Sequence, residues 1–391
     1  MTTALPPLDR DALMAAATAV TGCDDWGSDT NFIDSLDVLI TDMRESARLT
    51  EAGVAAQVQD LLRLLINRLG FSRDVAQHPE ILDEVIEPPI VILGMPRTGT
   101  SKLQRTIAAD PGMQRLEVWR LLNPSPVMGD QATRIAIGEQ FEQALRQVPE
   151  FMARHPMEAR EPDEDLWLME LTFDAPVASH RLHLPKHREW IADRQRFAYS
   201  YMRTMLQYLQ WQDGGSRGRP WVLKSPMHIG QVALLHELFP GALFIQCHRD
   251  IHTVLGSYCS LIEVARAMNS DHVDLTALGP DFAAFWGRYT AQNLAARAAI
   301  PDLNLYDVGF ESIRDDIHGV IDEIYSRAGR TVTPAARAAF EQYDARRPPG
   351  HFGTHDYDPS RWGVTRELVA EHFGDYEKAF PELGRTTATG A

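Results

Sequence analysis

A short apolar run followed by a glycine-containing loop constrains this sequence most. Ile90 to Leu93 are apolar, and the next eight residues read Gly-Met-Pro-Arg-Thr-Gly-Thr-Ser. This order predicts a buried strand, a tight turn and a helix, because glycines permit unusual backbone angles and close approach. The N–H groups of such a turn and the dipole of the following helix favour phosphate. The candidate ligands are Arg97, Thr98, Gly99, Thr100 and Ser101.

The loop differs from the Walker A motif of kinases and NTPases. The G-x-x-x-x-G spacing is present at 94–99, but Thr100 stands where that motif requires Lys. The later apolar strands also lack a convincing Walker B Asp. A P-loop-type small-molecule kinase is therefore an alternative interpretation and not the first one.

Strand-like segments recur along the chain, and helical patterns separate them. They lie at 221–226, 242–250 and 303–311. This alternation predicts a helix-rich α/β fold, with a P-loop-like parallel sheet flanked by helices on both faces. We divide the chain into a helical N-terminal extension at 1–86 and a main α/β domain at 87–391. The main domain carries a helical insertion at about 125–215.

Three local expectations can be compared with the structure directly. Asp9 is placed as the N-cap of the first helix, and Gly70 is expected to end a helix that begins at about residue 54. The tail at 345–364 is rich in Pro, Gly and His, which predicts an ordered loop.

Composition narrows the function. The net charge is -16 and the sequence pI is about 5.3, which disfavours general binding of nucleic acid. The three cysteines show no metal or disulfide spacing, so we expect a cytoplasmic protein. No apolar run approaches the roughly 20 residues that span a bilayer, and the first residues do not resemble a signal peptide.

A second candidate anion site follows the strand at 242–250. Arg249 stands at the tip of this strand, and Ser257 comes eight residues later in the next helix. An arginine fork and a hydroxyl in these positions could bind a second phosphate group. The alternative is a surface Arg–Asp pair followed by an ordinary helical serine.

The two motifs together resemble the sulfotransferases that use 3′-phosphoadenosine 5′-phosphosulfate (PAPS), in particular a bacterial branch with long helical insertions. In that family a P-R/K-S/T-G-T-T/S loop holds the 5′-phosphosulfate, and an Arg with a Ser eight residues later holds the 3′-phosphate. PRTGTS at 96–101 and Arg249 with Ser257 match both motifs. The resemblance implies that Lys224, in WVLKSP, contacts the transferring sulfonate. It also implies Phe310 beside the adenine, where the family motif has Tyr.

The resemblance is less specific at the C-terminal end. Arg361 and Gly363 could correspond to the basic, glycine-containing loop that closes over PAPS in cytosolic members; the alternative is a packed tail around a buried Trp362. The family implies sulfonate transfer by positioning and charge neutralisation, with Arg97 and Lys224 facing the negative charge that builds on the leaving group. No metal is expected.

The general base stays open at the level of sequence. The His that cytosolic members carry two residues after the strand Lys is replaced here by Pro226. Glu117, at a spacing similar to that of the catalytic Glu of tyrosine-protein sulfotransferases, is the first candidate. His228 is the second candidate. The third is the acidic group Glu161, Glu164 and Asp165, within which Glu164 is preferred, and His183, in an isolated His-Leu-Pro sequence, is the last.

The helical insertion is rich in aromatic and aliphatic residues, most of which must form core. The part that lies over the ligand-binding edge of the sheet would suit a small, apolar or aromatic acceptor with a hydroxyl group. A nucleotide-binding protein without catalytic activity is a further alternative, and the association of two copies of the chain also stays open.

Overall fold

The computed structural model of the protein describes residues 5–347 and 357–382. Its centre is a sheet of four parallel strands in the order β2-β1-β3-β4. The strands are β1 (Ile90–Gly94), β2 (Val222–Lys224), β3 (Leu243–His248) and β4 (Leu305–Gly309). The expected parallel sheet is therefore confirmed. The fourth strand ends two residues earlier than expected, because Phe310 already begins helix α15.

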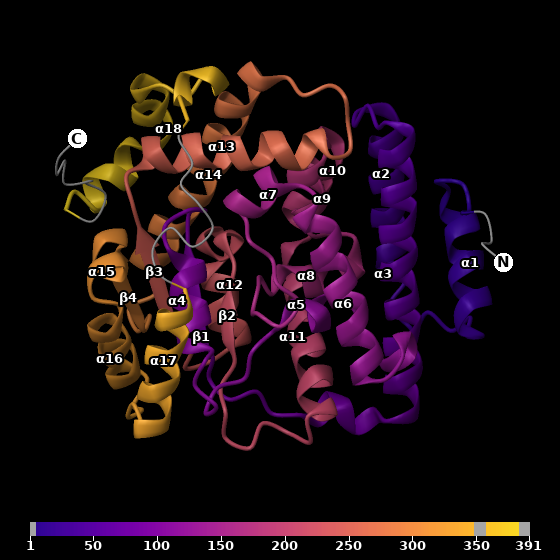
Figure 1. Ribbon diagram of the computed structural model, residues 1–391, viewed down its shortest axis with the longest axis horizontal. Coiled ribbons are helices and arrows are strands. Elements are labelled where there is room, and N and C mark those ends of the chain that lie inside the picture. The colour runs from indigo at the N-terminus through magenta and orange to yellow at the C-terminus, as the bar shows by residue number, and fades with distance from the viewer. Residues whose placement is uncertain (1–4, 348–356, 383–391) are drawn as a thin grey trace.

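Helices cover both faces of the sheet, as the sequence predicts (Figure 1). Side chains alternate along β1: Ile90 and Ile92 join a core under α4, α16 and α17, whereas Val91 and Leu93 join the larger core on the other face. All five residues of β1 are buried. A run that is apolar throughout is what a parallel strand between two helical layers requires.

The helices fall into four groups along the chain. Before the sheet lie α1 (Arg10–Thr21), α2 (Asn31–Glu45), α3 (Glu51–Gln77) and η1 (Pro79–Asp83). Between β1 and β2 lie α4 (Thr100–Ile107), α5 (Val118–Leu122), η2 (Pro126–Met128), α6 (Gln131–Arg146), α7 (Pro149–Arg154), α8 (Leu166–Met169), η3 (Glu170–Thr172), α9 (Val177–Arg181), α10 (Pro185–Trp190), η4 (Ile191–Asp193) and α11 (Gln195–Gln212). Between β2 and β4 lie η5 (Pro226–Gly230), α12 (Val232–Leu238), α13 (Ile251–Ala267) and α14 (Leu275–Ala299). After β4 come α15 (Phe310–Asp315), α16 (Ile317–Arg327), α17 (Pro334–Arg346), η6 (Pro359–Trp362) and α18 (Arg366–Ala379).

The N-terminal helices show one confirmed and one wrong local prediction. Asp9 caps α1, where its carboxylate accepts a hydrogen bond from the N–H of Ala12. Gly70 does not end a helix, since α3 continues through it to Gln77. A Cβ atom at residue 70 would lie 2.3 Å from Ser125 Oγ, so glycine serves close packing at this position. The division of the chain at residue 86 stays a prediction.

The expectation of a loop at 345–364 is only partly met. Helix α17 continues to Arg346 and η6 forms at Pro359–Trp362, while residues 348–356 lie outside the described part of the chain.

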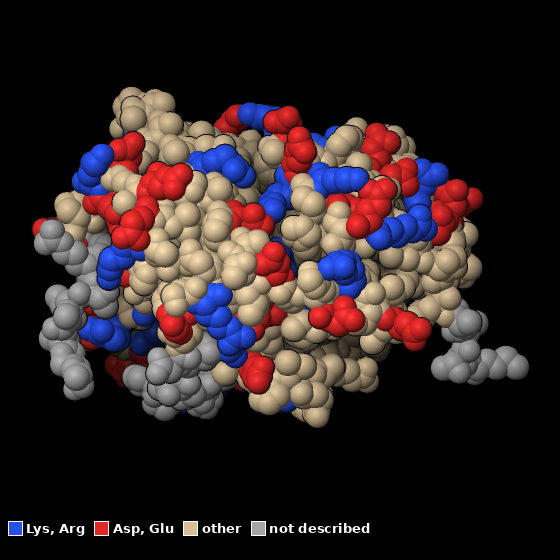
Figure 2. Space-filling view, turned by 90° about the horizontal axis from the view of Figure 1, so that it is seen from above, with Lys and Arg blue, Asp and Glu red and all other residues tan. Residues whose placement is uncertain are grey.

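Within the described residues, none of the helices combines the length and the apolar character needed to cross a membrane. On the face shown in Figure 2, acidic and basic side chains are interspersed.

The contact between the ends of β1 and β3 predicts a stability effect. Gly94 has a φ of 141°, and a Cβ atom there would lie 2.4 Å from the carbonyl oxygen of Cys247. We expect Gly94→Ala to lower the free energy of unfolding by about 3 kcal/mol, from backbone strain and overpacking together. Urea unfolding measures this. Gly218→Ala is the control, because Gly218 also has a positive φ but open space around it; equal losses in the two variants would contradict the packing argument.

Candidate active site

The loops that leave β1 and β3 run to opposite faces of the sheet. Helix α4, after β1, packs Leu103 and Ile107 into the core on one face, and α13, after β3, packs Val254 and Leu255 into the core on the other. Strand order reverses at this point, which opens a crevice at the carboxyl ends of the two strands. Open α/β sheets bind their ligands in such a crevice.

The turn after β1 has the backbone of an anion-binding loop. Arg97 and Gly99 both have positive φ values, of 69° and 90°. A Cβ atom at residue 99 would lie 3.2 Å from the Phe310 ring, so both conformation and space favour glycine. The Thr98 hydroxyl donates to the Met95 carbonyl and holds the turn together. The free N–H groups at the start of α4 are thereby presented to the crevice.

The structure brings the two sequence motifs into direct contact. Arg97 Nε donates to Ser257 Oγ at 3.1 Å, and Arg249 NH1 donates to the Arg97 carbonyl at 3.0 Å. The Arg249 guanidinium also lies 4.1 Å from the centre of the Phe310 ring. Four predicted site residues, from the loops after β1 and β3 and from helices α13 and α15, therefore form one cluster.

Both arginines of this cluster lack a carboxylate partner among the described residues. Arg97 donates to Ser257 and to the carbonyl of Arg154, and Arg249 donates to a carbonyl. Burial and the neighbouring Arg249 lower the pKa of Arg97. Burial likewise lowers the pKa of Arg249. Two close, partly buried cations that form no ion pair with a carboxylate among the described residues favour an anionic ligand.

Lys224 lies at the end of β2 and is 1% exposed. Its Nζ donates to Glu164 at 3.0 Å and lies 3.8 Å from Asp163. Burial raises the pKa of Glu164, and the charges of Asp163 and Asp165 raise it further, against the attraction of Lys224. The Glu164 carboxyl group therefore holds a proton more readily than an exposed glutamate does.

Three consecutive carboxylates here differ in their nearest partners. Asp163 faces Arg105 and His155 at 3.5 and 3.7 Å, Glu164 faces Lys224, and Asp165 contacts His228. The backbone fixes the arrangement, because the N–H of Asp165 donates to the carbonyl of Lys224. Sequence reasoning named Glu164 and Asp165 of this group as possible bases and preferred Glu164.

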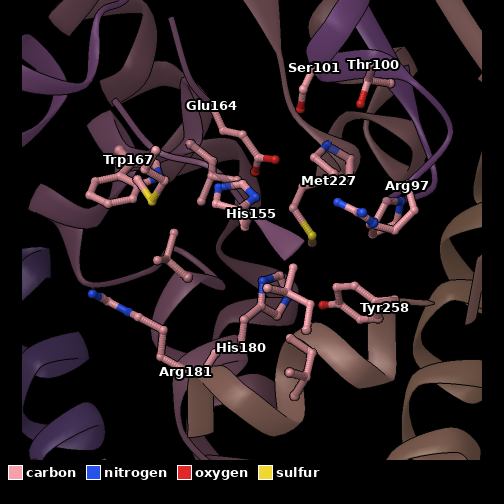
Figure 3. A pocket seen from close by; sticks show the side chains of 18 of the residues that line it. Arg97, Thr100, Ser101, His155, Glu164, Trp167, His180, Arg181, Met227 and Tyr258 are labelled. Atoms are coloured by element: carbon pink, nitrogen blue, oxygen red, sulfur yellow. The ribbon is translucent and has the colours of Figure 1, made fainter. Parts of the chain in front are cut away.

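A cavity of about 150 Å³ adjoins the loop and Glu164. In Figure 3, Thr100, Ser101 and Glu164 lie at one end, and His180 and Tyr258 lie at the other. The rest of the lining is mainly apolar, with Phe151, Met157, Leu166, Trp167, Val177, Met227, Leu261, Ile262 and Ala265 among its residues. Sequence reasoning did not predict that His155 and His180 line it. Burial lowers the pKa of His155 to about 4.

His228 lies behind this cavity and does not line it. Its side chain is 0% exposed, and both ring nitrogens have partners at 3.0 Å, the Asp165 carboxylate and the Tyr199 hydroxyl. These contacts favour a structural role for His228.

Two other base candidates also lie outside the cavity. Glu117 precedes α5 and accepts hydrogen bonds from Trp119 Nε1 and Arg115, each at 3.0 Å. It lines a separate polar pocket. His183 is exposed and lines a third pocket beside Arg266. The structure places neither Glu117 nor His183 in contact with Lys224.

The structure does not bring Arg361 and Gly363 to the arginine cluster. Arg361 pairs with Glu263 on α13. Gly363 ends η6 with a φ of 69° and packs against α14, where a Cβ atom would lie 3.0 Å from the Thr276 carbonyl oxygen.

Fold and site together define an α/β protein with a crevice at a switch in strand order, lined by two arginines and adjoining a mainly apolar cavity. Residues 88–334 match the sulfotransferase family, and the chain belongs to this family. The sulfotransferase interpretation is thereby confirmed over that of a kinase.

Mycobacterial proteins are among the similar ones. The chain is 23% identical over 352 residues to omega-hydroxy-beta-dihydromenaquinone-9 sulfotransferase Stf3 from Mycobacterium bovis, covering 84% of this chain and 86% of the relative. The structure of the present chain resembles that of sulfotransferase STF1 from Mycobacterium tuberculosis H37Rv. The TM-score is 0.78, the identity is 29%, and the match covers 93% of this chain and 98% of STF1. Sulfotransferase STF9 from Mycobacterium avium shares the fold, with a TM-score of 0.85, 24% identity and coverage of 98% and 100%.

The contacts of His228 predict that it stabilises the fold. We expect His228→Ala to lower the free energy of unfolding by about 3 kcal/mol, because it leaves Asp165 and Tyr199 buried without their partner. Urea unfolding of the purified chain measures this. His183→Ala, at an exposed position, should stay within about 0.5 kcal/mol of the unchanged protein. A His228→Ala variant of full stability would show that these buried contacts contribute little.

Proposed function

We propose that this protein transfers a sulfonate group from PAPS to a hydroxyl group of a small acceptor with an apolar body. One observation carries the proposal: Arg97 and Arg249, from motifs far apart in sequence, meet as partly buried cations without carboxylate ion-pair partners among the described residues. A ligand with phosphate groups at two separate places would neutralise both. PAPS is such a ligand, and it supplies the sulfonate in activated form.

The proposed donor site uses the crevice between β1 and β3. The N–H groups at the start of α4, with Thr100 and Ser101, hold the 5′-phosphosulfate. Arg249 and Ser257 hold the 3′-phosphate, and the ring of Phe310 stacks beside the adenine. Arg97, which already contacts Ser257, lies between the two groups.

We propose Glu164 as the general base, in preference to Glu117 and His228. Its carboxylate takes the proton of the acceptor hydroxyl while the oxygen attacks sulfur, and the bond from sulfur to the 5′-phosphate oxygen breaks. Lys224, 3.0 Å from Glu164, stabilises the negative charge on the leaving bisphosphate. Glu164 is preferred because it alone among these three lines the cavity next to the loop.

The acceptor is proposed from the lining of the cavity. Its largely aliphatic and aromatic wall suits the apolar end of a phenol or a lipid alcohol. The name of the relative Stf3 gives an omega-hydroxy menaquinone derivative as its substrate, which is likewise a hydroxyl on an apolar body. We also propose a cytoplasmic location, since the unpaired thiols of Cys247 and Cys259 are compatible with a reducing compartment.

Binding of the donor product tests the nucleotide site. Adenosine 3′,5′-bisphosphate at a hundredfold excess over its Kd should stabilise the protein by about 2.7 kcal/mol without Mg²⁺, because it binds only the folded state. Thermal unfolding with and without the bisphosphate measures this, with ATP and Mg²⁺ as the comparison. Arg249→Met should abolish the shift, whereas Arg219→Met, at a different pocket, should retain it. Stabilisation by ATP alone would contradict the proposal.

Two matched carboxylate variants test the base. We expect Glu164→Gln to lower kcat by about 10²- to 10⁴-fold, because proton removal from the acceptor is lost. Glu117→Gln should leave kcat within about twofold, since Glu117 lies outside the cavity. Sulfonate transfer to a panel of phenols measures both, and binding of the bisphosphate should persist in both. The reverse order of effects would make Glu117 the base.

The pH profile provides an independent test of Glu164. A base acts only when ionised, so activity should fall as pH drops through the pKa of Glu164. This pKa is raised above the usual 4.5, so the fall should begin at a higher pH than for an ordinary glutamate. In Glu164→Gln this acidic limb should vanish from the residual rate. An unchanged limb would assign it to another group.

A further inference from the structure

The cavity has a polar group of side chains at each end. The end described above contains Thr100, Ser101 and Glu164. At the opposite end, beyond Met227, the Tyr258 hydroxyl points into the cavity toward His180 (Figure 3). Trp286 completes the lining at this end. These three side chains come from α9, α13 and α14, and no part of the proposed transfer uses them.

Three polar atoms at this inner end have no hydrogen-bond partner among the described residues. They are the Tyr258 hydroxyl, Trp286 Nε1 and His180 Nε2. Tyr258 is 3% exposed and Trp286 is 0% exposed, so bulk water does not satisfy them. The buried Tyr208 and Tyr325 differ, since their hydroxyl groups donate to Asp74 and Asp110. The Tyr201 hydroxyl also lacks a partner among the described residues, but it does not line this cavity.

The three side chains form one aromatic cluster. The rings of His180 and Trp286 flank Tyr258, with centroids 5.9 and 5.8 Å away and edge-to-face geometry. Rings at these separations can reach a single bound group. Burying polar atoms without partners is unfavourable, so their convergence on one cavity points to a ligand atom that accepts their hydrogen bonds.

The charge at this end favours a neutral ligand group. Burial and the nearby Arg266 lower the pKa of His180 to about 3, so the imidazole is uncharged near neutral pH. Arg181 also lines this end, but its guanidinium pairs with Glu170 at 2.8 Å and Asp60 at 3.0 Å. A buried carboxylate would need a cation of its own. A carbonyl, hydroxyl or ether oxygen needs only a hydrogen-bond donor.

We propose that Tyr258, Trp286 and His180 form a second recognition site for the acceptor, which binds a neutral oxygen at the end of the molecule remote from the hydroxyl that is sulfonated. This inference rests on the proposed function and narrows its acceptor class. The cavity of about 150 Å³ holds about one ring with a short chain between its two ends. The preferred acceptor is therefore a phenol or alcohol whose apolar body carries a distal ketone, hydroxyl or ether.

Three phenols of similar size test the proposal. They are para-butylphenol, para-hydroxybenzylacetone, which adds one ketone to the same chain, and para-hydroxyphenylpropanoate, which ends in a carboxylate. In the ketone and in the carboxylate, two methylene groups separate the phenol ring from the added group. Calorimetric titration of the protein with and without adenosine 3′,5′-bisphosphate gives their Kd values. We expect the ketone to bind about tenfold more tightly than para-butylphenol, the gain of roughly one net hydrogen bond.

Two variants connect this preference to the cluster. Tyr258→Phe removes a single oxygen atom and should reduce the preference for the ketone to about twofold or less. Its Tm should be unchanged or higher, because the hydroxyl that is lost has no partner among the described residues. Tyr208→Phe is the matched control: it should keep the tenfold preference while lowering Tm by about 3 °C, since it leaves the Asp74 Oδ2 atom without its buried donor. Trp286→Phe supplies a second variant of the cluster with the same expected loss of preference.

The outcomes separate this inference from the proposed function. A ketone preference that disappears in Tyr258→Phe and survives in Tyr208→Phe supports the second site, whether or not sulfonate is transferred. Equal binding of the ketone and para-butylphenol, tightest binding of the carboxylate, no binding of any of the three, or a preference that survives in both cluster variants overturns it. Sulfonate transfer without a ketone preference would leave the proposed function intact and remove only the second site.

Discussion

The close contact between the carboxyl ends of β1 and β3 determines where everything else in the site can lie. Gly94 packs against the carbonyl of Cys247 with no room for a side chain. The loops that follow therefore start side by side and then separate to opposite faces of the sheet. Arg97 and Arg249, one from each loop, are consequently held together. In a chain of net charge -16 they are partly buried cations without carboxylate ion-pair partners among the described residues, and this local excess of positive charge is the basis on which we propose an anionic ligand.

Much of this crevice could be predicted from the sequence because its signals are local. An apolar run, two glycines and a cation within twelve residues specify strand, turn and helix together, and the spacing of Arg249 and Ser257 is likewise contained in one strand-to-helix connection. Gly70 shows the limit of local reasoning. Glycine often ends a helix, but here a distant contact with Ser125 explains its presence, and α3 continues. Burial against a remote segment cannot be read from neighbours in sequence.

The candidate base shows the same limit more sharply. Asp163, Glu164 and Asp165 are adjacent in sequence and chemically alike, yet their surroundings assign them different properties. Lys224, His155 and Arg105 lower the pKa of Asp163 against the opposing effect of burial, whereas burial raises that of Glu164. Partners from β2, α4 and the end of α7 produce these differences, and no spacing rule identifies them. Ranking carboxylates as bases therefore requires the tertiary structure.

The arrangement of polar groups around the cavity also explains why an apolar composition alone describes an acceptor poorly. An aliphatic wall binds many apolar ligands of similar volume with similar affinity, since each methylene group contributes little to discrimination between ligands. Discrimination comes from buried polar atoms that remain unpaired when the wrong ligand binds. The inner cluster around Tyr258 has this property, while Glu164 and Lys224 occupy the reacting end. In the proposed arrangement, a molecule that satisfies both ends is fixed in one direction, and the oxygen bound farthest from Glu164 would determine which hydroxyl reaches this carboxylate.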